Sequence, residues 1–389
     1  MKFSSNTGDL LQALHLVSRA IGTQQALPIL GNILMKVEGK RCTVSATDLE
    51  LSIITSFEAN IENEGSITIP AKAIVNFAQY NNDAEVLLET SEGTQLKCTS
   101  KHAKTLIAGE AASEYPTIST VEKQTSFTLE ADPLLHALHM VTFASTKTTL
   151  RPVLSGVYFR TEKGKLILVA TDSYRLSEYK MPLQGGASDL SCIIPTKILE
   201  ELKIILGARK GEKKSEGKED KKEKDVIKES ALKVEATMSK QQIEFQIGST
   251  RLLSRLIDGK FPDYEQIIPK DTKTKVLFST HELLVATRRM HYFAKEMNNN
   301  LTFHIAKGEA RVMTPQTQAG RDEASLVVEK SGDDNKIALS SSYLLDFLGH
   351  TGDSNVEMRI VDSVHPAVFV APQTPHCLHL IMPLRMQEE

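Results

Sequence analysis

Apolar residues near the start of the chain recur with a helical period. Leu10, Leu14 and Val17 are three or four positions apart, so they share one face of an α-helix. Asn6 and Thr7 stand just before this stripe, and both are residue types that cap helix N-termini. The pattern predicts an amphipathic helix that begins near Asn6 or Thr7 and buries its apolar face.

The same stripe returns twice further along the chain. Leu134 and Leu138 repeat it after Asp132, a capping type, and Pro133, which suits a first helical position. Ser279 opens a third copy, because Ser-Thr-His-Glu has the spacing of a capping box. Second helices are predicted at 71–80, 196–206 and 342–349, and strands at 42–46, 166–170, 356–361 and 378–382. Each copy is therefore predicted to be α+β, with two helices against antiparallel sheet.

These copies reflect an internal sequence repeat. Residues 10–50 align without a gap to residues 134–174, and 13 of the 41 pairs are identical. Ordinary composition would give about two or three identities by chance. A third, more diverged copy starts at Leu283. We therefore predict three tandem domains of one kind, at residues 1–122, 123–270 and 271–389.

A run of charged residues interrupts the second copy. Residues 209–230 hold nine Lys or Arg and seven Asp or Glu in 22 positions. Few of these side chains can enter a core, so the segment 208–230 is predicted to be a disordered, solvated insertion.

Few residue patterns in the chain carry chemistry. His136 and His139 are three apart on a predicted helix, where a solvated face is favoured over a shared metal. Asp48 and Asp172 close strands in two copies, where a repeated Asx turn is favoured over a catalytic role because it explains both. The sequence has no Gly-rich phosphate loop, C-x-x-C or G-x-S-x-G. It predicts no cofactor, no metal and no catalytic residue.

Composition and charge narrow the class of protein further. The net charge of −3 argues against a generally basic nucleic-acid binder, although a local basic surface remains compatible with it. The four cysteines are far apart and are predicted to be reduced core thiols. The chain has neither an apolar run of 18 residues nor a signal-peptide pattern, so we expect a cytoplasmic protein.

Five segments resemble one known family in their order and spacing. They are Leu27–Asn32, Ala46–Glu50, Ala170–Leu176, Asp258–Tyr264 and Met382–Met386. Together they are similar to the bacterial DNA polymerase III β sliding clamps, the β subunit or processivity factor of the replicative polymerase. The resemblance covers the whole chain apart from the charged segment. It implies a non-catalytic DNA replication protein: a head-to-tail homodimer whose six domains form a ring around duplex DNA, with helices lining the hole.

The resemblance also implies a cleft between the second and third domains that takes a short hydrophobic peptide. Such peptides would come from the polymerase α subunit, the clamp loader and other proteins with a clamp-binding motif. An apolar groove with a few polar positions suits this role, although core packing explains some of its members equally well. The cleft residues carried over by motif are Leu154, Thr171, Tyr174, Arg175, Leu176, Pro262, Ile267, Tyr343, Val364, Met382, Pro383, Leu384 and Met386.

Two further residue sets follow from the resemblance. A sliding contact needs sparse positive charge that attracts phosphate without reading bases. On the implied inner helices the candidates are Arg19, Lys72, Lys197, Lys203, Arg288 and Arg289. The implied dimer contact sets Lys104 and Ile107 of one chain against Tyr292 and Phe293 of the other.

Two other functions are compatible with duplicated α+β domains. One is a DNA-modifying or hydrolytic enzyme, which requires a convergent cluster of His, Asp or Glu that the sequence does not display. The other is a clamp-like paralogue that binds partner proteins without encircling DNA.

Overall fold

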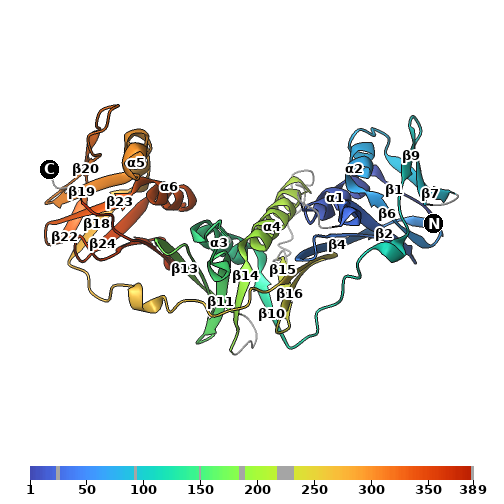
Figure 1. Cartoon of the computed structure of the whole chain (residues 1–389), viewed down its shortest axis with the longest axis horizontal. Coiled ribbons are helices and arrows are strands. Elements are labelled where there is room, and N and C mark those ends of the chain that lie inside the picture. Colours follow the sequence, from blue (N-terminus) through green and yellow to red (C-terminus); the bar gives the residue numbers. More distant parts are fainter. Residues whose placement is uncertain (23–26, 92–93, 149, 184–188, 217–231, 387–389) are drawn as a thin grey trace, which may run out of the picture. The chain divides into compact units, whose positions relative to one another are not determined.

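The computed structural model describes every residue except 23–26, 92–93, 149, 184–188, 217–231 and 387–389. Its internal contacts divide into two compact units. Unit 1 comprises residues 1–131 and 201–256, and unit 2 comprises residues 132–200 and 257–389. Figure 1 labels the helices and strands. In the part of the chain that is described, no helix is long and apolar enough to cross a membrane.

The elements repeat three times in one order: strand, helix, four or five strands, helix, three strands. The first copy contains β1 (Lys2–Asn6), α1 (Thr7–Ser18), β2 (Asn32–Glu38), β3 (Arg41–Thr47), β4 (Leu51–Glu58), β5 (Asn60–Asn63), β6 (Gly65–Pro70), α2 (Ala71–Gln79), β7 (Glu85–Ser91), β8 (Gln95–Thr99) and β9 (Lys104–Ala108).

The second copy contains β10 (Thr125–Glu130), α3 (Ala131–Val141), β11 (Gly156–Glu162), β12 (Lys165–Thr171), β13 (Arg175–Pro182), β14 (Ser191–Pro195), α4 (Thr196–Glu216), β15 (Lys233–Met238), β16 (Gln242–Ile247) and β17 (Thr250–Arg255). The third contains β18 (Thr274–Ser279), α5 (Thr280–Ala294), β19 (Asn300–Ala306), β20 (Glu309–Met313), β21 (Glu323–Val327), β22 (Glu329–Gly332), β23 (Asn335–Ser340), α6 (Ser341–His350), β24 (Asn355–Ile360), β25 (Ala367–Ala371) and β26 (Thr374–Ile381). The predicted repeat and the α+β class are confirmed.

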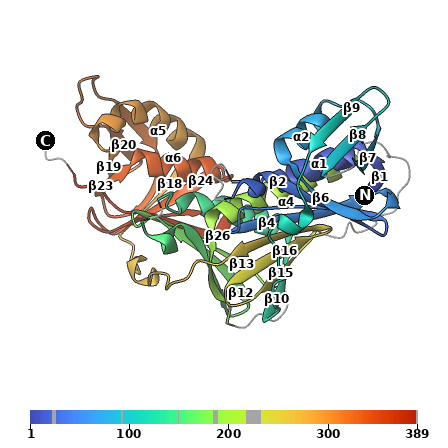
Figure 2. The same cartoon turned by 45° about the vertical axis from the view of Figure 1, so that its right-hand side comes forward.

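The helices form where the periodicity predicts them. Leu10, Leu14 and Val17 of α1 are completely buried, and the Asn6 side chain caps the helix by accepting a hydrogen bond from the N–H of Gly8 at 2.8 Å. Ser279 caps α5 in the same way. In unit 2, α5 and α6 pack side by side against strands of the third copy (Figures 1 and 2).

Two local predictions are corrected. Helix α3 begins at Ala131, so Asp132 lies in its first turn and is not its cap. Helix α4 continues to Glu216, so residues 208–216 are helical and not coil. Lys and Glu are good helix formers, and they extend a helix that is already nucleated. Residues 217–230 of the predicted insertion lie outside the described residues.

Sheets run across the boundaries between copies. The four sheets have the strand orders β5-β1-β7-β8-β9, β10-β15-β16-β17-β4-β3-β2-β6, β14-β11-β12-β13-β26-β25-β24-β18-β22 and β21-β20-β19-β23. Strand β4 of the first copy pairs antiparallel with β17 of the second, and β13 of the second pairs with β26 of the third. The equivalent strands left over are β9 in the first copy and β21 in the third. Each is the outermost strand of its sheet within the described chain.

The four cysteines are free and buried, as predicted for core thiols. Burial raises the pKa of the Cys42, Cys98, Cys192 and Cys377 thiols to about 12. Near neutral pH they are therefore protonated and carry no nucleophilic or metal-binding thiolate.

Candidate functional site

A tight turn follows β12 and displays the first group of expected cleft residues. The Asp172 carboxylate accepts the N–H groups of Tyr174 and Arg175 at 2.9 and 3.0 Å. The Thr171 hydroxyl donates to the carbonyl of Arg175 at 2.6 Å. Ser173 has a φ of 81°, which the turn requires. The backbone of Tyr174 is fixed by these bonds, while its ring is exposed.

The same turn occurs in the first copy, so the predicted repeated Asx turn is confirmed. Asp48 accepts the N–H groups of Glu50 and Leu51 at 3.0 and 2.7 Å. Thr47 donates to the carbonyl of Leu51 at 2.9 Å, and Leu49 has a φ of 76°. Both aspartates therefore hold backbone N–H groups that would otherwise lack partners.

Arg175 is a buried cation with two carboxylate partners. Its guanidinium donates to Asp172 at 3.0 Å and to Asp346 of α6 at 2.5 Å. It also lies over the Tyr343 ring, 4.7 Å from the centroid. Burial, followed by the charge of Asp172, raises the pKa of Tyr343. These contacts hold two expected cleft residues together: Arg175, which belongs to β13, and Tyr343, which belongs to α6.

A hydrophobic cluster lies under the turn. Leu154 and Leu176 belong to it, together with Phe261 and Tyr264 of the segment that follows β17. Met382 packs against its edge. Leu154 and Leu176 are both buried within this cluster, whereas core packing is excluded for the exposed Ile267 and Val364.

Other expected cleft residues are accessible. Val364 is 72% exposed and Ile267 is 42% exposed. Pro262 is also exposed, whereas Tyr343 is half-buried. Accessible apolar side chains and a packed apolar cluster in the same unit are compatible with a groove for a hydrophobic peptide.

The segment that carries Pro262 and Ile267 is held by a polar clamp that the sequence did not reveal. The Tyr264 hydroxyl donates to the buried Glu178 carboxylate at 2.6 Å and accepts from the Arg160 guanidinium at 2.9 Å. Burial, followed by the Glu178 hydrogen bond, raises the pKa of Tyr264. Arg160 and Tyr264 are 104 positions apart, so no local pattern could have paired them.

The last described residues form the remaining wall. The N–H of Met382 donates to the carbonyl of Tyr174 at 2.8 Å. The N–H of Leu384 donates to the carbonyl of Ala338 at 2.8 Å. The Asn300 side chain donates to the carbonyl of Arg385 at 3.2 Å. Pro383, Leu384 and Met386 are half-buried. Unit 2 therefore contains all thirteen expected cleft residues and fixes the backbone on both sides of Met382.

The expected DNA-facing residues differ in their surroundings. Lys72 on α2, Lys197 on α4 and Arg288 on α5 are exposed, and Lys203 is half-buried. Arg19 instead forms an ion pair with Glu201. Arg289 donates to both carboxylate oxygens of Asp322, at 2.7 and 3.1 Å. The charges of Arg19 and Arg289 are therefore partly neutralised within the chain.

One expected interface residue is corrected. Ile107 is only 6% exposed, because its side chain faces the core of its own unit. The neighbouring Leu106 on β9 is 58% exposed. Successive strand residues point to opposite faces, so only one of two adjacent apolar residues is available to a partner. Tyr292 is exposed and its ring meets Phe293 edge-on at 5.3 Å.

The histidine pair on α3 faces solvent. His136 and His139 are exposed; the first ring packs edge-on against Tyr179 at 5.5 Å and the second lies 4.6 Å from the His350 ring. Within the described residues, no group of three His, Cys, Asp or Glu is placed to hold a metal ion.

The threefold repeat, with sheets that continue from one copy into the next, defines the class of three-domain DNA clamps. Family profiles described as the N-terminal, central and C-terminal domains of the DNA polymerase III beta subunit match residues 1–119, 128–214 and 265–385. The chain belongs to the DNA polymerase III beta subunit family.

Individual relatives agree over full length. The beta sliding clamp of Caulobacter vibrioides is 29% identical, covering 99% of this chain and 100% of the relative. That of Escherichia coli is 24% identical with the same coverage. The crystal structure of the DNA polymerase sliding clamp from Bacillus subtilis superimposes with a TM-score of 0.90 at 24% identity, covering 100% of both chains. That of the Pseudomonas aeruginosa clamp bound to griselimycin gives 0.89 at 24% identity, covering 99% of this chain and 100% of that one. The comparisons give no support to a clamp-like paralogue that does not encircle DNA.

Proposed function

We propose that two copies of this chain close head to tail into a ring around duplex DNA. The observation that carries the proposal is the pair of leftover strands, β9 and β21. Their equivalents already pair with each other at both boundaries between copies, as β4 with β17 and β13 with β26. A third junction of the same kind is available only between chains, and repeating it with the symmetry of a dimer closes six domains.

Both edges carry exposed apolar and charged side chains. β9 carries exposed Leu106 and Lys104, and β21 carries exposed Val327 and Glu323. Tyr292 on α5 adds an exposed aromatic ring. An apolar contact with a polar margin is typical of a stable protein interface. Long unpaired edges with exposed aliphatic residues are otherwise a risk for aggregation.

Sparse positive charge supports a sliding contact with DNA. Six residues on or beside the helices supply it: Arg19, Lys72, Lys197, Lys203, Arg288 and Arg289. Arg19 and Arg289 form ion pairs with Glu201 and Asp322, and these carboxylates compete with phosphate. Such contacts attract duplex without reading its sequence. The ring thus remains on DNA through its topology and not through affinity.

Partner proteins bind the cleft of unit 2 in this proposal. The polymerase α subunit, the clamp loader and other clamp-binding proteins insert a short hydrophobic motif over the Leu176 cluster, between exposed Val364 and Met382. The chain itself acts as a non-catalytic processivity factor in the cytoplasm, without cofactor. Its domains span residues 1–122, 123–270 and 271–389.

Topology gives the decisive experiment. After loading on nicked circular DNA by the cognate loader with ATP, the protein should persist through a high-salt wash and be released when the circle is linearised. Equal retention on linear and circular DNA would refute encirclement. Arg288→Glu should lower the loaded fraction several-fold, because it reverses an exposed charge on α5. Lys275→Glu, an exposed change on β18, is the matched control and should load normally.

A further inference from the structure

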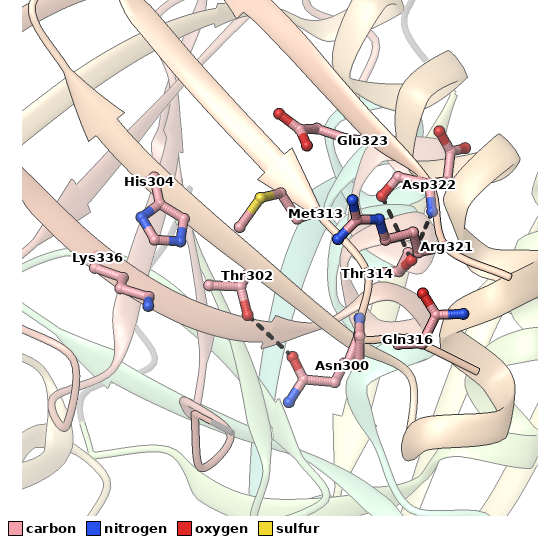
Figure 3. A pocket seen from close by; sticks show the side chains of 11 residues that line it. Asn300, Thr302, His304, Met313, Thr314, Gln316, Arg321, Asp322, Glu323 and Lys336 are labelled. Atoms are coloured by element: carbon pink, nitrogen blue, oxygen red, sulfur yellow. Dashed lines mark hydrogen bonds between the residues drawn. The ribbon is translucent and has the colours of Figure 1, made fainter. Parts of the chain in front are cut away.

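A polar trough crosses one face of the four-stranded sheet in unit 2, opposite α5 and α6. Side chains alternate along β19, so that Leu301 and Phe303 are buried while Thr302 and His304 face the trough. Two adjoining cavities, of about 450 and 540 Å³, share His304 and Lys336 as lining residues. We call them together the sheet trough. Figure 3 shows the first cavity, with Lys336 and Arg321 on opposite sides of it.

Each acidic side chain that lines the sheet trough already has a partner within the chain. Asp322 accepts from Arg289 at 2.7 Å, and Glu323 lies 3.2 Å from Arg311. Asp334 pairs with Lys330. The fourth acidic residue is Asp362, which accepts the ring N–H of His365 at 2.8 Å and the backbone N–H of Val364. These hydrogen bonds lower the pKa of Asp362 to about 2. None of the four basic partners lines either cavity.

The two cations that do line the sheet trough have no such partner. Neither Lys336 nor Arg321 forms an ion pair with any described residue. Lys336 is half-buried on β23, opposite His304 in the strand register. Arg289, Arg311 and Lys330 balance three of the four acids, so Lys336 and Arg321 remain available to an acidic ligand.

The sheet trough is continuous with the walls of the cleft. Met386, the last described residue, lines its second cavity. So does Ser363, whose neighbour Val364 is one of the exposed apolar cleft residues. A peptide seated between Val364 and Met382 therefore has the sheet trough directly beside it.

We propose that the sheet trough binds an acidic segment that adjoins the hydrophobic motif of the partner peptide. The inference rests on the proposed function, because it assigns the chemistry of residues flanking the motif in the cleft. Lys336 and Arg321 attract the carboxylates, and the Gln316 amide, which donates one N–H to the carbonyl of Thr317, offers its second N–H to them. Partners whose motif has an acidic flank bind more tightly than those with a neutral or basic one.

The test uses three labelled peptides with the same hydrophobic motif, each flanked on both sides by three Glu, three Gln or three Lys. Binding to the full chain is measured by fluorescence anisotropy. We expect the Glu peptide to bind about three- to tenfold more tightly than the Gln peptide at low salt, and the advantage to shrink as salt is added. Lys336→Glu and Arg321→Glu should each reduce that advantage, and Lys336→Arg should retain it.

Lys275→Glu is the matched control for charge and should leave all three affinities unchanged. The dimer content and melting temperature of each variant are measured alongside. If the Gln peptide fails to bind the wild type, the cleft itself is wrong. If it binds and the Glu peptide gains nothing, only the sheet trough is refuted. If the Glu peptide binds more tightly than the Gln peptide only after residues 387–389 are deleted, the sheet trough is occupied by the C-terminal residues of the chain itself. That result would overturn the proposal.

Discussion

At the residue scale, a fully buried histidine lies next to the cation of the cleft. The ring nitrogen Nδ1 of His379 is 2.7 Å from the Ser177 hydroxyl, and the ring stacks on Phe347 at 4.8 Å. Burial, followed by the charges of Arg175 and His350, lowers its pKa well below the usual value. The imidazole is therefore neutral in the folded protein at physiological pH.

This histidine makes stability depend on pH. Below about pH 6.5 the unfolded chain binds a proton that the folded chain does not, so the free energy of unfolding falls as pH falls. One such group contributes a slope of up to about 1.4 kcal/mol per pH unit. We expect His379→Asn, whose amide oxygen can still accept from Ser177, to flatten this slope. Urea unfolding at pH 7.5, 6.5 and 5.5, at fixed protein concentration, measures it, and parallel slopes would contradict the assignment.

Single residues also show where the sequence was insufficient. Leu106 and Ile107 are equally apolar, so only the strand register decides which one faces outward. Arg289 is positioned like a phosphate contact on α5, but Asp322, 33 positions away, binds it. Asp346 gave no signal as the partner of Arg175 because the two are 171 positions apart. Composition and periodicity constrain neither of these long-range pairings.

At the element scale, prediction was more successful because helices and strands are local. The 3.6-residue stripes located α1, α3 and α5, and the offset of 124 positions placed two copies of the fold. The end of α4 was missed, since a high density of charge is typical of disorder as well as of a solvated helix. Tyr174, Arg175 and Met382 came together because their motifs stand at the paired ends of β13 and β26.

The C-terminal segment tests the cleft as an element. It adds to the outer edge of β23 through the bond from Leu384 to Ala338. A chain that ends at Ile381 loses this wall, and we expect it to bind a hydrophobic clamp-binding peptide at least tenfold more weakly while remaining dimeric. A chain that ends at Met386 keeps the wall and is the matched control. Both shortened chains are tested with the peptide whose hydrophobic motif is flanked by Gln. Full binding by the shorter chain would show that the wall is misassigned.

At the scale of the whole molecule, the leftover edges predict the assembly state. The protein should sediment near twice its 43.0 kDa. Leu106→Asp places an uncompensated charge on the β9 edge, and Phe293→Asp does the same beside β21, so each should shift the protein toward monomer at micromolar concentration. Sedimentation velocity measures the shift.

The control for the assembly prediction lies elsewhere on unit 2. Val364→Asp also replaces an accessible apolar residue, but in the cleft. It should leave the dimer intact and weaken peptide binding. A wild-type protein that sediments only as monomer, or a dimer that tolerates both edge substitutions, would rule out junctions built from β9 and β21.

The pairing of sheets across copies also constrains how the chain is made. Thr55 on β4 meets Thr250 on β17, 195 positions later, and Ser177 on β13 meets His379 on β26, 202 positions later. At about 5–20 residues per second of synthesis, β4 waits on the order of 10–40 s for its partner to emerge. Contacts so distant in sequence also slow folding, since a long loop must close first. Each nascent chain therefore spends this interval with an open strand edge, which is a state prone to pair with other chains and aggregate.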